Sequence, residues 1–348
     1  METLWFILVS FVFVMYVLLD GFDLGAGIIH LFAGKTEQER RLILNAIGPV
    51  WDGNEVWILV AGGTLYFAFP LVYASSFSGF YLPLIMVLWL LMMRGLGIEF
   101  RHQVHHPMWT KFWDVVFSIS SALLAVFLGA ALGNVVRGVP LNAEGYFFEP
   151  LWTTFTVVPE AGILDWYTVI LGLVTFFTLA VHGASYIAMK TDGPVQARSR
   201  SIVRKSWWGM TITSLAGAAA TFSIRPEMIS NFTTSLWGFL FPLLGILGLA
   251  GIWLYNRRTQ DARAFLSSGV FIFGALGGTA FALYPNLLTS STDPAYSLTA
   301  HNAAAQQYGL TVGLVWWTFG ILLALGYFIY LYRSFRGKVS LPPDGSGY

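Results

Sequence analysis

The chain has 348 residues, of which 56% are hydrophobic and only 11% are charged, with a formal net charge of +1. About a quarter of the residues in a soluble domain are charged, so this composition predicts a single polytopic membrane domain. The small net charge offers no basic surface for nucleic acid, and the absence of cysteine excludes disulfides, thiolate-held clusters and thioether-linked haem.

Nine windows are long and apolar enough to cross a membrane, which takes about 20 residues. They cover residues 4–33, 52–71, 77–98, 112–136, 165–189, 207–224, 236–256, 264–288 and 308–332. The first window has no Lys or Arg before it, so we expect a membrane helix rather than a cleaved signal. The predicted fold class is an all-α polytopic membrane protein with nine transmembrane helices.

The distribution of basic residues predicts the orientation. Most of the 19 Lys and Arg residues follow the first, third, fifth, seventh and ninth windows. Arg137 and Arg225 are the basic residues on the opposite side, and Arg94 lies inside a window. Because Lys and Arg are retained on the cytoplasmic side, the N-terminus is expected outside and the C-terminus in the cytoplasm.

The first window ends in DGFDLGAG, residues 20–27, which places two carboxylates in an apolar helix. Asp20, Asp23 and His30 are spaced to share one helix face, which is expected to turn away from lipid. Arg94, inside the third window, is the expected counter-ion in a buried ion pair. The alternative is that these residues reach the headgroup layer, where a carboxylate costs less.

The second window begins within GPVWDGNEVW, residues 48–57, where Pro49 fits the start of a helix. Asp52 and Glu55 lie on one face of the first turn, and two close carboxylates resist double ionisation. One of them would hold a proton at neutral pH, which is the chemistry of a proton path. The alternative is a capping carboxylate with an exposed neighbour.

Histidines are the candidates for haem or metal chemistry. His182 lies in a polar stripe of the fifth window and, together with His30, could ligate a haem inside the helix bundle. The alternative for a membrane histidine is an interhelical hydrogen bond. The loop sequence RHQVHHP, residues 101–107, contains no carboxylate, so the sequence predicts no metal site in this chain.

Several motifs resemble a known family. DGFDLGAG, GPVWDGNEVW, YASSFSGFY at residues 73–81 and PNLLTSSTDPAYSLT at residues 285–299 are together similar to subunit II of the cytochrome bd-type quinol oxidases. The resemblance covers nearly the whole chain. It implies two four-helix bundles, within residues 1–136 and 165–288, and a peripheral ninth helix at 308–332.

The resemblance also implies a partner and its cofactors. Subunit I of such an oxidase carries the quinol site, two b-type haems and one d-type haem, while subunit II ligates no iron. The complex oxidises quinol, reduces oxygen to water and contributes to the proton motive force without pumping. It resides in the bacterial or archaeal cytoplasmic membrane, and the resemblance leaves room for a small accessory subunit and for a bound lipid or structural quinone.

Residue roles carried over by motif follow the same resemblance. Asp52 matches a carboxylate of a cytoplasmic proton path, whereas Glu55 stands where some members have glutamine. Asp20 and Asp23 match an acidic pair of the first helix, with Arg94 as a buried partner. A structural role in polar packing is expected for His182 and for the terminal Tyr348.

Two other functions remain open at this stage. The same carboxylates could drive proton-coupled transport, for which broken helices in corresponding halves would be typical. His30 and His182 could instead make the chain a haem-binding redox protein.

Overall fold

The computed structural model describes residues 1–340, and this part of the chain is mostly helical. The α-helices are α1 (Glu2–Ala33), α2 (Glu37–Ile47), α3 (Trp51–Ala68), α4 (Pro70–Gly79), α5 (Tyr81–Glu99), α6 (Pro107–Arg137), α7 (Trp166–Lys190), α8 (Gly193–Ile224), α9 (Ser230–Thr234), α10 (Leu240–Arg257), α11 (Asp261–Leu283) and α12 (Gln307–Ser334). Two short strands, β1 (Asn286–Leu288) and β2 (Leu298–Thr299), form an antiparallel pair.

Seven helical segments of the described chain are long and apolar enough to cross a membrane: α1, α5, α6, α7, residues 236–257, α11 and α12. The predicted windows 52–71 and 207–224 are also helical, in α3 and in the second half of α8, but neither helix meets this measure. By length and apolarity, seven helical segments of the described chain are therefore candidate spans, and the other two of the nine expected stay a prediction. The difference arises because α3 begins with polar residues and because the second half of α8, although uncharged, contains several Thr, Ser and Gly residues.

Two window boundaries are corrected. The window 264–288 is helical only to Leu283, because Pro285 cannot continue the helix and the residues after it form β1. The window 77–98 begins inside α4, and the helix breaks at Phe80 before α5 starts.

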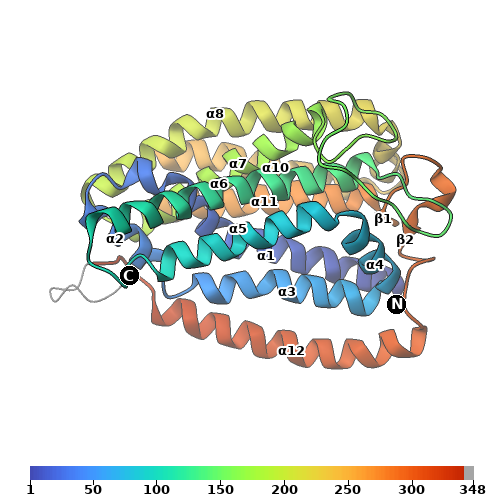
Figure 1. The fold of residues 1–348 in the computed structure, drawn as a ribbon, viewed down its shortest axis with the longest axis horizontal. Helices are drawn as coiled ribbons and strands as arrows, with labels where there is room; N and C mark the ends of the chain where they lie inside the picture. Colours follow the sequence, from blue (N-terminus) through green and yellow to red (C-terminus); the bar gives the residue numbers. More distant parts are fainter. Residues whose placement is uncertain (341–348) are drawn as a thin grey trace.

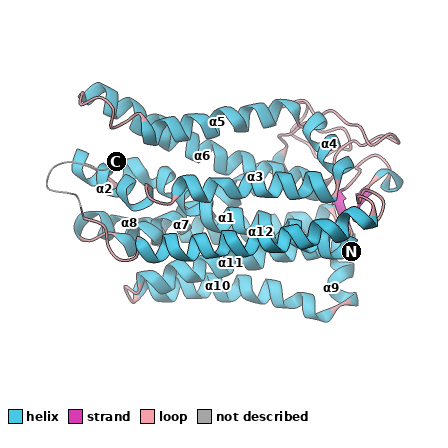
Figure 2. Ribbon diagram, turned by 90° about the horizontal axis from the view of Figure 1, so that it is seen from below, coloured by secondary structure: helices cyan, strands magenta, loops and turns pink. Residues whose placement is uncertain are grey.

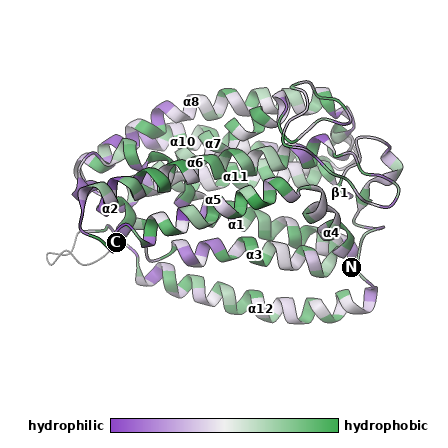
Figure 3. Ribbon diagram, in the orientation of Figure 1, coloured by the Kyte–Doolittle hydropathy of each residue, from purple (hydrophilic) through white to green (hydrophobic). Residues whose placement is uncertain are grey.

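The long helices run side by side, and the two ends of the described chain lie at opposite ends of the bundle (Figure 1). The loop after α6 and the β1–β2 pair lie at the end that holds the N-terminus, whereas α2 lies at the other end. α12 runs along one side of the molecule beside α3 (Figures 1 and 2). Hydrophobic residues cover much of the long helices, and hydrophilic residues gather at α2 and the neighbouring helix ends (Figure 3).

α1 is the central helix, since it contacts α3, α6, α7, α8 and α11. The glycines of DGFDLGAG allow this close packing. A Cβ atom on Gly25 would lie 2.0 Å from the carbonyl oxygen of Leu179 in α7, and one on Gly183 would lie 2.2 Å from the main chain of Gly25. The motif therefore brings the acidic part of α1 against α7 at backbone contact, as small residues do between membrane helices.

Candidate functional site

The acidic residues of α1 are buried where α1 meets α3 and α5. Asp20 is fully buried and accepts two hydrogen bonds from Nη1 of Arg94, at 2.7 and 2.8 Å. Nη2 of Arg94 donates to Oε2 of Glu55 at 2.7 Å. A single buried guanidinium thus joins carboxylates from two helices through charge-assisted hydrogen bonds.

Asp23 has a different partner from the one expected. Its Oδ2 accepts a hydrogen bond of 2.7 Å from the Asn54 side chain, whose Oδ1 accepts one of 2.8 Å from the Tyr332 hydroxyl. Within the described residues the other carboxylate oxygen of Asp23 has no hydrogen-bond partner. The arrangement connects α1 through α3 to α12, and it makes Asn54 and Tyr332 part of the site although neither was selected from the sequence.

The buried carboxylates connect to the surface along α3. Asp52 is exposed in the first turn of α3, and the Glu55 side chain, one turn further on, is 25% exposed. Side chains three residues apart are neighbours on a helix surface. Asp52, Glu55, Arg94 and Asp20 therefore form a graded series from the surface to the fully buried interior.

The two buried histidines are both engaged within the chain. His182 uses one ring nitrogen with the Ser268 hydroxyl at 2.7 Å and the other with the Leu18 carbonyl at 3.0 Å. His30 is bonded through Nε2 to Asp114 at 2.6 Å. This geometry does not fit axial ligation of a haem by the pair, because His182 has no nitrogen left for iron. The described residues also contain no group of three or more His, Cys, Asp or Glu arranged to hold a metal.

A second buried cluster, which the sequence analysis did not identify, surrounds Asp114 in the first part of α6. Asp114 accepts from Arg101 at 2.6 Å and from Arg40 at 3.0 Å, in addition to the contact with His30. Arg101 also bonds Glu37 at 2.9 Å. The only sequence signal was a carboxylate near the start of an apolar window. These contacts hold α2 against α1 and α6.

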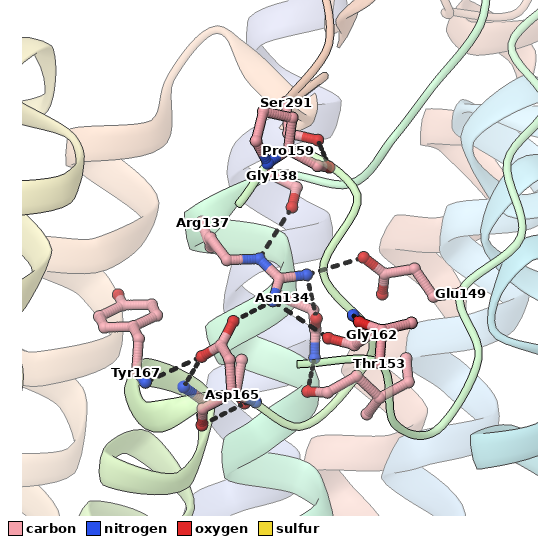
Figure 4. A network of polar contacts seen from close by, with 12 residues as sticks. Asn134, Arg137, Gly138, Glu149, Thr153, Pro159, Gly162, Asp165, Tyr167 and Ser291 are labelled. Atoms are coloured by element: carbon pink, nitrogen blue, oxygen red, sulfur yellow. Dashed lines mark hydrogen bonds and ion pairs between the residues drawn. The ribbon is translucent and has the colours of Figure 1, made fainter. Parts of the chain in front are cut away.

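A third cluster lies at the opposite end of the bundle, around Arg137 (Figure 4). Arg137 donates to Asp165, to Glu149 at 2.7 Å and to Oδ1 of Asn134 at 2.7 Å. Asp165 also accepts from two backbone N–H groups of the first turn of α7, each at 2.8 Å, and so caps that helix. Burial raises the pKa of Glu149 to about 8, and the neighbouring Arg137 opposes part of this rise.

Tyr348 lies outside the described residues, so its expected polar packing stays a prediction. The other residues selected from the sequence are all placed. Asp20, Glu55 and Arg94 meet directly, Asp23 is bonded to Asn54, and Asp52 lies at the surface.

The chain is similar to known proteins over almost its whole length. The family described as cytochrome bd terminal oxidase subunit II matches residues 1–335. Cytochrome bd ubiquinol oxidase subunit 2 of Bacillus subtilis is 33% identical over 98% of this chain and 97% of that protein. Cytochrome bd-I ubiquinol oxidase subunit 2 of Escherichia coli K12 is 30% identical, covering 97% and 94%.

One solved structure has a similar fold. A chain in the structure of bd oxidase from Geobacillus thermodenitrificans aligns with a TM-score of 0.75 and 18% identity, covering 96% of this chain and 98% of that chain. At this identity the likeness concerns the fold alone.

Proposed function

Because the chain belongs to the cytochrome bd terminal oxidase subunit II family, we propose that it supports a haem-bearing subunit I in oxidising quinol and reducing oxygen to water. In this proposal the two b-type haems, the d-type haem and the quinol site belong to subunit I. The engagement of both nitrogens of His182 supports this division of labour. A small accessory subunit and a bound lipid or structural quinone belong to the same proposal.

The proposed placement is that of a multi-pass protein in a bacterial cytoplasmic membrane, with the N-terminus outside. α3 and α8 are included as spans, which gives nine helices. α8 runs along the bundle beside α7 (Figure 1), and the termini lie at opposite ends, as an odd number of spans requires. The two four-helix bundles would then be α1, α3, α5, α6 and α7, α8, α10, α11, with α12 peripheral.

The chain's own contribution is proposed to be a proton path from the cytoplasm. Asp52 takes up a proton at the surface and passes it to Glu55, which shares Arg94 with the buried Asp20. Asp20, Asp23 and Glu55 are three carboxylates near one guanidinium. An uncompensated carboxylate in apolar surroundings is costly, so such a site binds and releases a proton more readily than a balanced pair.

This direction of transfer fits an oxidase that does not pump. Protons for reducing oxygen would come from the cytoplasm, while those of the quinol leave outside. Each charge moved against a 100 mV potential costs about 2.3 kcal/mol. The observation that carries the proposal is the graded series from the exposed Asp52 to the fully buried Asp20, joined through Arg94.

The test is Asp52→Asn in the two-subunit complex. We expect quinol-driven oxygen consumption to fall, and to fall further as pH rises, while the haem spectrum stays normal. Asp192→Asn is the matched control, since Asp192 is an exposed aspartate at the same end of the bundle and distant from Arg94 in sequence. Normal turnover of the Asp52 variant at every pH would show that the path does not begin there.

A further inference from the structure

α8 and α10 form an antiparallel pair whose register is fixed by two hydrogen bonds. The Trp207 indole donates to the Leu249 carbonyl at 2.9 Å, and the Asn256 side chain donates to the Arg200 carbonyl at 3.2 Å. The facing positions are therefore 200 and 207 on α8 and 249 and 256 on α10. These contacts lie in the first half of α8, which carries the basic residues.

Each helix carries an exposed stripe directly beside these contact positions. On α8 the stripe follows helical spacing through Arg204, Trp208, Ile212 and Leu215, and on α10 through Arg257, Trp253, Ala250 and Ile246. Each stripe lies on the helix face one residue C-terminal to the contact positions, so that Trp208 follows Trp207 on α8 and Arg257 follows Asn256 on α10. In an antiparallel pair of right-handed helices this offset turns both stripes to the same side. We call this surface the α8–α10 face.

The two arginines of the α8–α10 face are free to bind an anion. Arg257 lies over the Trp253 ring, 3.7 Å from its centroid, and so is directed back toward the level of Arg204. Among residues 1–340 neither arginine forms an ion pair with a carboxylate. The neighbouring Arg200 is different, since it is paired with Asp261 at 2.6 Å. Two unpaired guanidiniums that share one face favour a ligand carrying negative charge.

We propose that the α8–α10 face binds an anionic phospholipid, with Arg204 and Arg257 on its headgroup phosphate. The rest of the face fits acyl chains rather than water, because Ile212 is 62% exposed and Ile246 is 64% exposed in the direction away from the arginines. Trp208 and Trp253 lie between the basic and the aliphatic parts, where tryptophan is typical of the membrane interface. A free phosphate would use the arginines but leave this apolar surface uncovered.

The inference rests on the proposed membrane placement and not on the proton path. Basic residues at the cytoplasmic leaflet each contribute about 1 kcal/mol to binding anionic lipid, which corresponds to roughly fivefold in affinity. Arg204→Gln and Arg257→Gln are therefore each expected to weaken binding roughly fivefold, and the double variant about 25-fold. Arg333→Gln, an exposed arginine in the last turn of α12, is the matched control and should bind as the wild type does.

The experiment uses the delipidated two-subunit complex in detergent, titrated with phosphatidylglycerol, phosphatidylethanolamine or inorganic phosphate. Native mass spectrometry counts the lipids retained, and the thermal midpoint reports stabilisation. We expect a selective response to phosphatidylglycerol that the double variant loses while quinol oxidation continues. Equal binding by the double variant and the Arg333 control would overturn the inference. So would equal binding of both lipids, or a full response to phosphate alone.

Discussion

Glu149 offers a test of how the loop after α6 is anchored. Its carboxyl group is fully buried and shares Arg137 with Asp165, which also caps α7. One guanidinium cannot compensate both carboxylates, and burial raises the pKa of Glu149 to about 8. The protonated group can still accept the hydrogen bond from Arg137 through Oε1. In the variant Glu149→Gln the side chain is uncharged at every pH, so it mimics the protonated form of Glu149.

The expected magnitude follows from linkage. An unfolded glutamate ionises near pH 4.5, so between that pH and about 8 the folded state holds a proton that the unfolded state has released. Stability therefore falls as pH rises, by about 1.4 kcal/mol for each pH unit. Between pH 6 and pH 8 the wild type should lose about 2–3 kcal/mol relative to Glu149→Gln, and the difference should level off above that range.

The assay is the thermal midpoint of the purified complex from pH 6 to pH 9.5. The difference in thermal midpoint between wild type and variant is taken at each pH. This difference removes the contributions of all other titrating groups, because both proteins share them. Glu144→Gln is the matched control, because Glu144 is an exposed glutamate of the same loop and should show no pH-dependent difference. If the difference in thermal midpoint between the wild type and Glu149→Gln stays constant across this pH range, the reasoning that the buried Glu149 holds a proton is refuted.

The remaining predictions concern the helix contacts. Gly25→Ala places a Cβ 2.0 Å from the main chain of α7 and should lower the thermal midpoint and the yield of complex, whereas Gly62→Ala, with open space around its Cβ position, should not. Arg94→Leu leaves Asp20 buried without its partner and should destabilise the complex by about 3–5 kcal/mol, measured by unfolding; adding Asp20→Leu should recover part of the loss. His182→Gln should leave the haem absorption bands unchanged, because both ring nitrogens are bonded within the chain, and a lost band would contradict this.

The sequence predicts the helices well where physical constraints are local. Apolar windows of sufficient length mark the spanning segments, and the 3.6-residue period places Asp20 and Asp23 on one face. Arg94 is conspicuous because a charge in an apolar window needs a partner. The two windows that fell short of the apolarity measure, 52–71 and 207–224, contain polar residues, which are Asp, Asn and Glu at the start of the first window and Thr and Ser along the second.

What the sequence could not predict is the choice among distant partners. Asp23 is bonded to Asn54, an uncharged residue with no special spacing, and Asn54 is bonded to Tyr332, 278 residues further along the chain. Glu149 lies in a loop without periodicity, so its meeting with Arg137 depends on how that loop folds back. Such contacts follow from the packing of whole helices and loops rather than from local pattern.

The two buried clusters at the end of the bundle near α2 differ in how far cations compensate their carboxylates. Asp114 is saturated with partners, since Arg101, Arg40 and His30 all bond it. Around Arg94 the balance is reversed, because carboxylates outnumber cations and an oxygen of Asp23 has no partner among the described residues. The first arrangement suits holding helices together, and the second is compatible with the proton path proposed above.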